Sequence, residues 1–158
     1  MSPITVSDFL DLGLLHHIGI VVDDIEAAAQ HFAHTYGLTV SLADESTYRC
    51  RIDGMENTTV QRLGMTVAGP PHVELLRAVP GSPVWQPVPG VHHIGFVVDD
   101  LARASEELAR RGSPMWMGGV RGDGCPAGTA YHRDRFGLTV ELLDSATEKR
   151  LAARFFGK

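Results

Sequence analysis

A ten-residue segment occurs twice in this chain, and this repeat constrains the fold more than any other feature. "LHHIGIVVDD" covers residues 15–24, and "VHHIGFVVDD" covers residues 91–100. A second pair follows further along, with "HVELL" at residues 72–76 and "TVELL" at residues 139–143. Internal repetition indicates one structural unit used twice, in which each copy buries its apolar face against the other. The sequence therefore predicts two similar modules that share one core.

Each copy begins with the pattern of a strand followed by a helix. "HHIGIVV" is apolar and β-branched, which favours a strand. Asp23 and Asp24 are suited to cap the helix that follows, and Gly37 is suited to end it. The second copy repeats this pattern up to Gly112. Three shorter strands are predicted after each helix, at residues 38–43, 59–67 and 72–79 in the first half and 115–120, 129–133 and 138–143 in the second.

The predicted fold class is therefore α+β, with two tandem βαβββ modules. The first module covers residues 14–79 and the second covers residues 91–144. The segment between them, residues 80–90 ("PGSPVWQPVPG"), has the proline density of a linker. Residues 145–158 form a short amphipathic C-terminal helix, for which Ser145 and Glu148 provide a capping box.

Strand alternation selects four polar residues at matching places in the two halves. Side chains alternate across a strand, so His17 lies on the face opposite to Ile18, and the same parity selects His93. In the closing strands, Glu74 and Glu141 lie opposite their apolar neighbours. A carboxylate flanked by hydrophobic residues is costly to bury unless something pairs with it. These two histidines and two glutamates are therefore candidates to converge on one centre.

Composition excludes several classes of protein. The formal net charge of −5 and the lack of a Lys/Arg cluster argue against nucleic-acid binding. No apolar run approaches the roughly 20 residues that cross a bilayer, and the first residues do not resemble a signal peptide. Without a secretion signal, Cys50 and Cys125 are expected to be reduced thiols. A cytoplasmic protein without a membrane partner is expected.

The repeated "HHIG" strands and the "VELL" closing strands resemble the vicinal oxygen chelate superfamily, which includes glyoxalases, bleomycin resistance proteins and extradiol dioxygenases. The similarity extends from about residue 14 to residue 144 and is closest to the methylmalonyl-CoA epimerase and glyoxalase-like branch. It implies that the modules form one cupped mixed β-sheet with flanking helices. It also implies that the cup holds one divalent ion (Zn, Ni, Co, Mn or Fe) on the side chains of His17, Glu74, His93 and Glu141.

The same resemblance implies a metal-dependent lyase or isomerase that removes a proton next to a carbonyl or thioester. Glu74 or Glu141 is then the expected base, and His132 is a further catalytic candidate. Glu45 lies nearest to the expected position of the epimerase's second acid. His16 and His92 are expected beside the ligands rather than among them.

Two other functions stay open. The first is an Fe(II) extradiol-type dioxygenase, and the second is a non-catalytic binding or resistance protein. The expected partners are a small-molecule substrate and a second copy of the chain in a homodimer. The glycine-rich residues 118–128 are expected to form a mobile loop near the mouth of the cup, because they lack a phosphate-loop lysine.

Overall fold

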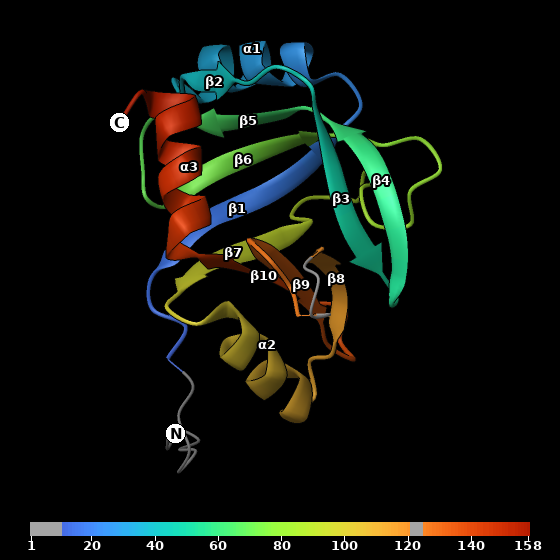
Figure 1. The fold of residues 1–158 in the computed structure, drawn as a ribbon. Coiled ribbons are helices and arrows are strands. Elements are labelled where there is room, and N and C mark those ends of the chain that lie inside the picture. The colour runs from blue at the N-terminus through green and yellow to red at the C-terminus, as the bar shows by residue number, and fades with distance from the viewer. Residues whose placement is uncertain (1–10, 121–124) are drawn as a thin grey trace, which may run out of the picture.

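A computed structural model describes residues 11–120 and 125–158. Within them, ten strands form one strongly curved mixed sheet, and three helices pack around it (Figure 1). The predicted α+β class, the cupped mixed sheet and the C-terminal helix are confirmed. Two predictions concern residues outside the described part of the chain. These are the absence of a signal peptide, which rests on residues 1–10, and the centre of the glycine-rich loop at residues 121–124.

The elements follow the repeat. The first half comprises β1 (Leu15–Val22), α1 (Ile25–Tyr36), β2 (Val40–Leu42), β3 (Ser46–Ile52), β4 (Met55–Gln61), β5 (Leu63–Thr66) and β6 (His72–Arg77). The second half comprises β7 (His93–Val98), α2 (Leu101–Arg110), β8 (Met115–Gly119), β9 (Thr129–Arg133), β10 (Thr139–Asp144) and α3 (Ser145–Phe156). The strand order across the sheet is β2-β5-β6-β1-β7-β10-β9-β8-β3-β4.

The two halves meet at the centre of the sheet. The opening strands β1 and β7 pair antiparallel with each other, while the closing strands β6 and β10 pair parallel with β1 and β7 respectively. The four strands that carry the repeated "HHIG" and "VELL" motifs are therefore adjacent. This arrangement brings residues from both ends of the chain to the same part of the concave face.

The first half contains a hairpin that the sequence patterns did not predict. Strands β3 and β4 lie at the far end of the sheet, where β3 pairs with β8 of the second half. The strand predicted at residues 59–67 is divided between β4 and β5. Polar and apolar residues alternate in β3, "STYRCRI", so its apolar signal is weak. Its pairing depends on the free edge of β8, which lies far away in the sequence.

The three helices differ in position. α1 and α2 cover the outer face of the sheet, whereas α3 lies across β6, β1 and β7 on the concave side (Figure 1). Asp24 and Asp100 cap α1 and α2 by accepting backbone N–H groups. The predicted capping residue of α3 was wrong by one position. Asp144, the last residue of β10, caps it by accepting the Thr147 N–H at 2.7 Å, so α3 starts without a loop.

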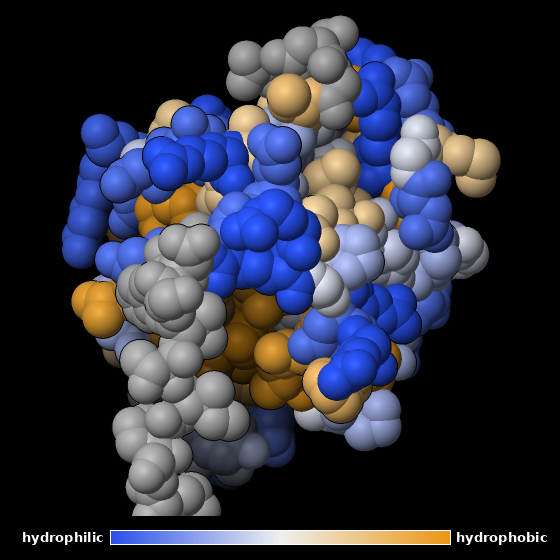
Figure 2. Space-filling model, turned by 90° about the horizontal axis from the view of Figure 1, so that it is seen from below, coloured by the Kyte–Doolittle hydropathy of each residue, from blue (hydrophilic) through white to orange (hydrophobic). Residues whose placement is uncertain are grey.

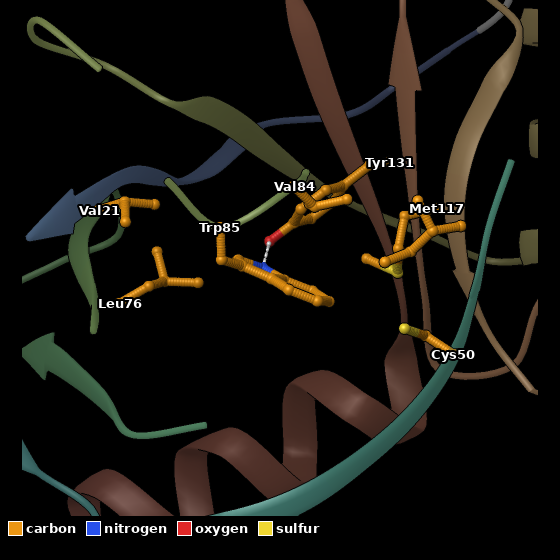
Figure 3. Packing of buried hydrophobic residues seen from close by; sticks show 8 residues of the cluster. Val21, Cys50, Leu76, Val84, Trp85, Met117 and Tyr131 are labelled. Carbon is orange, nitrogen blue, oxygen red and sulfur yellow. Dashed lines mark hydrogen bonds between the residues drawn. The ribbon is translucent and has the colours of Figure 1, made fainter. Parts of the chain in front are cut away.

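The largest apolar cluster fills the inside of the curve rather than the space under the helices. It joins Val21, Leu76, Trp85, Met117 and Tyr131, which come from five different segments and converge on the indole (Figure 3). The residues around α2 form a smaller cluster, and the underside of the molecule is mostly hydrophilic with apolar side chains visible in a hollow (Figure 2). None of the helices in the described residues has the length and apolar character needed to cross a membrane.

Candidate functional site

Four polar side chains meet on the concave face of the central strands. They are His17 of β1, Glu74 of β6, His93 of β7 and Glu141 of β10, each 6 % exposed or less. One possible ligand atom from each residue lies within 4.8 Å of the others. The structure therefore brings together the four residues that the strand alternation selected, although two of them are 124 positions apart in the chain.

The distances within this group are short. His17 Nε2 lies 3.0 Å from His93 Nε2, and Glu141 Oε2 lies 2.7 Å and 2.9 Å from the two nitrogens. Glu74 Oε2 lies 3.2 Å from His93 Nε2 and 3.6 Å from His17 Nε2. Two donors about 2.1 Å from one ion stand roughly 3.0–3.4 Å apart at octahedral or tetrahedral angles. The four atoms are thus spaced much as ligands of one ion would be.

Two glycines make room for the imidazoles. Gly19 pairs with His93, and Gly95 pairs with His17, across the β1–β7 ladder. A Cβ atom on Gly19 would lie 2.0 Å from His93 Cε1, and one on Gly95 would lie 2.1 Å from His17 Cε1. Each ring therefore lies over the glycine of the other half. The "HIG" motif is repeated because each histidine needs the glycine of its partner copy.

The two carboxylates differ in how they are held. Glu141 accepts a hydrogen bond from Thr129 Oγ1 on one oxygen and contacts both imidazoles with the other. Glu74 Oε2 is buried and has no hydrogen-bond partner within the described residues. A buried carboxylate oxygen without a donor carries a large desolvation cost, which a bound cation would offset. The donor chemistry and this oxygen both fit a divalent metal ion.

The electrostatics of the group also favour a positive charge at its centre. Burial opposes the charged form of His93, but the adjacent carboxylates of Glu141 and Glu74 outweigh it and raise the pKa of His93 to about 9. Burial likewise opposes the charged form of Glu141, yet His17 and His93 hold the pKa of this carboxyl well below its usual range. The two glutamates therefore stabilise a cation between them.

A second histidine supports each of the first two. His16 Nδ1 lies 2.8 Å from His17 Nδ1, and His92 Nδ1 lies 2.9 Å from His93 Nδ1. A β-bulge between Leu15 and His17 changes the local register of β1, so strict alternation does not describe His16. Burial is the main cause that lowers the pKa of His16, to about 4, and that of His92. Both outer rings are therefore neutral near pH 7.

A cavity of about 320 Å³ lies above these side chains, between the sheet and α3. Glu74 and Glu141 line one part of it, and most of its wall is apolar. The apolar part comprises Leu63, Leu76, Trp85, Met117, Leu143 and Leu151, together with the rings of Tyr48 and Tyr131. α3 contributes two cations, Arg150 and Arg154, which form no ion pair with any carboxylate of the described residues. The cavity is thus acidic at one part, apolar along its wall and cationic at α3.

Comparison with known proteins identifies the family to which the chain belongs. A family model described as "Glyoxalase/Bleomycin resistance protein/Dioxygenase superfamily" matches residues 16–131. The chain belongs to this superfamily. The match covers the two "HHIG" strands and both imidazoles of the cluster, and it ends before β10.

Within the superfamily, the chain is similar to an ethylmalonyl-CoA/methylmalonyl-CoA epimerase of Cereibacter sphaeroides. The two are 28% identical over 137 residues, which is 83% of this chain and 97% of the relative. Among solved structures, the methylmalonyl-CoA epimerase of Mycobacterium tuberculosis gives a TM-score of 0.58 at 21% identity, covering 87% of this chain and 91% of that one. A hypothetical protein of Bacillus halodurans C-125 gives a TM-score of 0.59 at 18% identity, covering 84% and 94%. These structures share the superfamily's fold.

Two candidates from the sequence lie outside the cavity of this superfamily member. His132 faces α2 on the other side of the sheet, where its Nε2 lies 2.7 Å from Ser105 Oγ and its Nδ1 donates to the Ser113 carbonyl at 2.7 Å. Register explains this, because Tyr131 pairs with Glu141 and so takes the concave side. Glu45 is exposed and forms an ion pair with Arg77 at 2.6 Å. His132 and Glu45 do not line the cavity, so its geometry does not support the catalytic role expected of His132.

Sequence patterns missed four residues that line the cavity. Trp85, 1 % exposed, comes from the segment predicted as a linker. Tyr48 comes from β3, the strand that was not predicted, and Arg150 and Arg154 come from α3. A tryptophan between prolines is the one signal that pointed to burial, because a solvated linker has no use for a large apolar ring.

Proposed function

We propose that this protein is a metal-dependent isomerase that epimerises an acyl thioester by moving the proton on the carbon next to the thioester carbonyl. The observation that carries the proposal is the convergence of His17, Glu74, His93 and Glu141, with one Glu74 oxygen unpartnered, beside a largely apolar cavity. The similarity to epimerases named for ethylmalonyl-CoA and methylmalonyl-CoA supports the choice of a thioester among carbonyl compounds.

In this proposal the four side chains hold one divalent ion. Two imidazoles and two carboxylates suit Zn²⁺, Ni²⁺, Co²⁺, Mn²⁺ or Fe²⁺ without choosing among them. When bound, such an ion supplies Lewis acidity that polarises a carbonyl and makes the adjacent C–H more acidic. Side chains of the protein carry out the proton transfer and bind the substrate.

Glu74 is the proposed base. Glu141 is held by Thr129 and by both imidazoles, so moving it would break several contacts. Glu74 Oε2 has no hydrogen bond to lose, and Glu74 lines the cavity. Glu74 would take the proton from the tetrahedral α-carbon, which then becomes planar. Return of this proton from Glu74, after the planar carbon has turned its other face to the carboxyl group, inverts the configuration. The largely apolar wall limits the access of bulk water, which strengthens the electrostatic contacts inside the cavity.

The arginines of α3 are proposed to bind the anionic part of the substrate. Arg150 and Arg154 are one helical turn apart, and both line the cavity. Arg154 is held in place by donating to the Asp44 carbonyl at 2.8 Å, and Arg150 by donating to Thr147 Oγ1 at 2.6 Å. Carboxylates and phosphates are the groups that guanidinium binds with the best geometry.

The test is exchange of the substrate's α-proton. Protein loaded in turn with each of the five metals is incubated with methylmalonyl-CoA in D₂O, and proton NMR follows the loss of the α-hydrogen signal while a chiral assay follows epimerisation. Exchange that requires the metal supports the proposal. Absence of exchange with every metal contradicts it, and consumption of oxygen with catechols in the presence of Fe²⁺ would favour a dioxygenase instead.

A further inference from the structure

His92 connects the segment before β7 to the donor cluster. Its Nε2 lies 2.7 Å from the carbonyl oxygen of Val84, and its Nδ1 lies 2.9 Å from His93 Nδ1. We infer that His92 is a positioning residue that accepts the Nδ1 proton of His93 and so directs His93 Nε2 toward the ion. The part of this inference that concerns metal affinity rests on the proposed function.

The donor and acceptor of each hydrogen bond between Val84, His92 and His93 follow from the chemistry of the Val84 carbonyl. A carbonyl oxygen only accepts hydrogen bonds, so His92 Nε2 must be the donor to Val84. A neutral imidazole carries one proton, and His92 Nδ1 is therefore the acceptor. His93 must then donate from its own Nδ1. The backbone of residue 84 thus sets the tautomer of a candidate ligand at the centre of the sheet.

The first half of the chain contains the same contact between the Nδ1 atoms of two neighbouring histidines. His16 Nδ1 lies 2.8 Å from His17 Nδ1, on the opposite side of the same cluster. Both pairs place the two rings nearly perpendicular, at 88°. The doubled histidine of "HHIG" is therefore used twice in the same way: the second histidine faces the cluster, and the first is bonded to its far nitrogen. Groups of this kind orient metal-binding imidazoles and raise their affinity for the ion.

The surroundings of His92 allow a clean substitution. Its ring lies beside Tyr131 and Trp116, with centroids 5.9 Å and 6.5 Å away, and it borders a second cavity of about 290 Å³. This space accommodates the slightly larger ring of phenylalanine, which has no acceptor. Asparagine supplies an oxygen near the position of Nδ1, so it restores the acceptor without the ring.

The experiment compares His92→Phe and His92→Asn with the wild type, and uses His34→Asn, an exposed residue of α1, as the control. The first readout is the ¹⁵N-edited proton resonance of His93 Nδ1–H, which needs no metal. The second is the dissociation constant for Zn²⁺, measured by competition with a chelator. Thermal melting verifies that each variant is folded.

We expect the His93 Nδ1–H resonance to disappear through exchange with water in His92→Phe and to persist at a shifted position in His92→Asn. Affinity for Zn²⁺ should fall by about 10- to 100-fold in the phenylalanine variant, recover in part with asparagine, and stay unchanged in the control. An unmoved resonance in either folded variant overturns the inference. If the wild type binds no metal, the proposed function fails, while the resonance still decides the role of His92.

Discussion

The imidazole of His93 lies over Gly19, at a distance that leaves no room for a Cβ atom. The same relationship connects His17 with Gly95, so the two halves of the chain are interlocked at their first strands. Because β6 places Glu74 beside Gly19 and β10 places Glu141 beside Gly95, two short rows of residues cross the centre of the sheet. One row is Glu74, Gly19 and His93, and the other is Glu141, Gly95 and His17. The glycine in the middle of each row makes space for the imidazole at its end.

Substitution of Gly19 by alanine should disrupt the cluster. A Cβ atom 2.0 Å from His93 Cε1 forces the ring to move, and such overpacking costs about 1–3 kcal/mol of unfolding free energy. Affinity for Zn²⁺ should fall as well. Gly64→Ala is the matched control, because its new Cβ meets the flexible end of Leu42 in β2, away from the cluster. Chemical denaturation and metal titration of both variants would refute the prediction if Gly19→Ala matched the wild type.

The two glutamates should respond differently to conversion into glutamine. Glu141 is held by Thr129 and contacts both imidazoles, so Glu141→Gln should weaken binding of the ion by more than roughly 100-fold. Glu74→Gln should bind metal more tightly than Glu141→Gln, yet its rate of α-proton exchange should fall by about 10²- to 10⁴-fold. Metal content and exchange rate are measured on each variant. Full exchange in metal-loaded Glu74→Gln would exclude Glu74 as the base.

Removal of metal should lower thermal stability. An ion that binds only the folded chain at 100 times its dissociation constant adds about 2.7 kcal/mol. Dialysis against a chelator should therefore reduce the melting temperature, and one equivalent of the correct ion should restore it. The double variant His17→Ala/His93→Ala provides the control, since its melting temperature should not depend on chelator. A wild type whose stability is indifferent to every tested ion would contradict the metal site.

Arg150→Gln and Arg154→Gln should weaken binding of an anionic thioester. Loss of a charged hydrogen bond costs about 1.5–3 kcal/mol, which corresponds to a rise in KM of roughly 10- to 150-fold with little change in kcat. Steady-state kinetics are measured with methylmalonyl-CoA and with its N-acetylcysteamine thioester. If KM rises for the CoA thioester alone, the arginines bind the phosphates of CoA. If KM rises for both thioesters, the arginines bind the substrate's carboxylate. No rise for either would show that α3 does not bind the substrate.

His132 should matter for stability and not for catalysis. Its nitrogens connect Ser105 of α2 with the Ser113 carbonyl, and His132→Phe removes both of these hydrogen bonds. The expected cost is about 1–3 kcal/mol of unfolding free energy. The exchange rate per folded molecule should remain that of the wild type. A large fall in this rate at unchanged stability would return His132 to the catalytic candidates.

Sequence alone determined the features that depend on local pattern and on the repeat. The duplicated "HHIG" and "VELL" segments predicted paired modules, and alternation along four strands selected the residues that meet in the cluster. Such inferences succeed because side-chain direction in a regular strand depends only on parity. Parity failed at His16, where a β-bulge shifts the register, and the sequence offered no way to choose between Tyr131 and His132.

Only the tertiary structure decided what surrounds the cluster. Strand β3 joins the far edge of the second half, Trp85 enters the cup from a proline-rich segment, and α3 crosses the concave face with two arginines. Each of these placements depends on a surface that is built by residues far away in the chain, and no local pattern describes such a surface. The same is true of the histidine pairs: His92 depends on the Val84 carbonyl, and His17 and His93 each depend on a glycine of the opposite half.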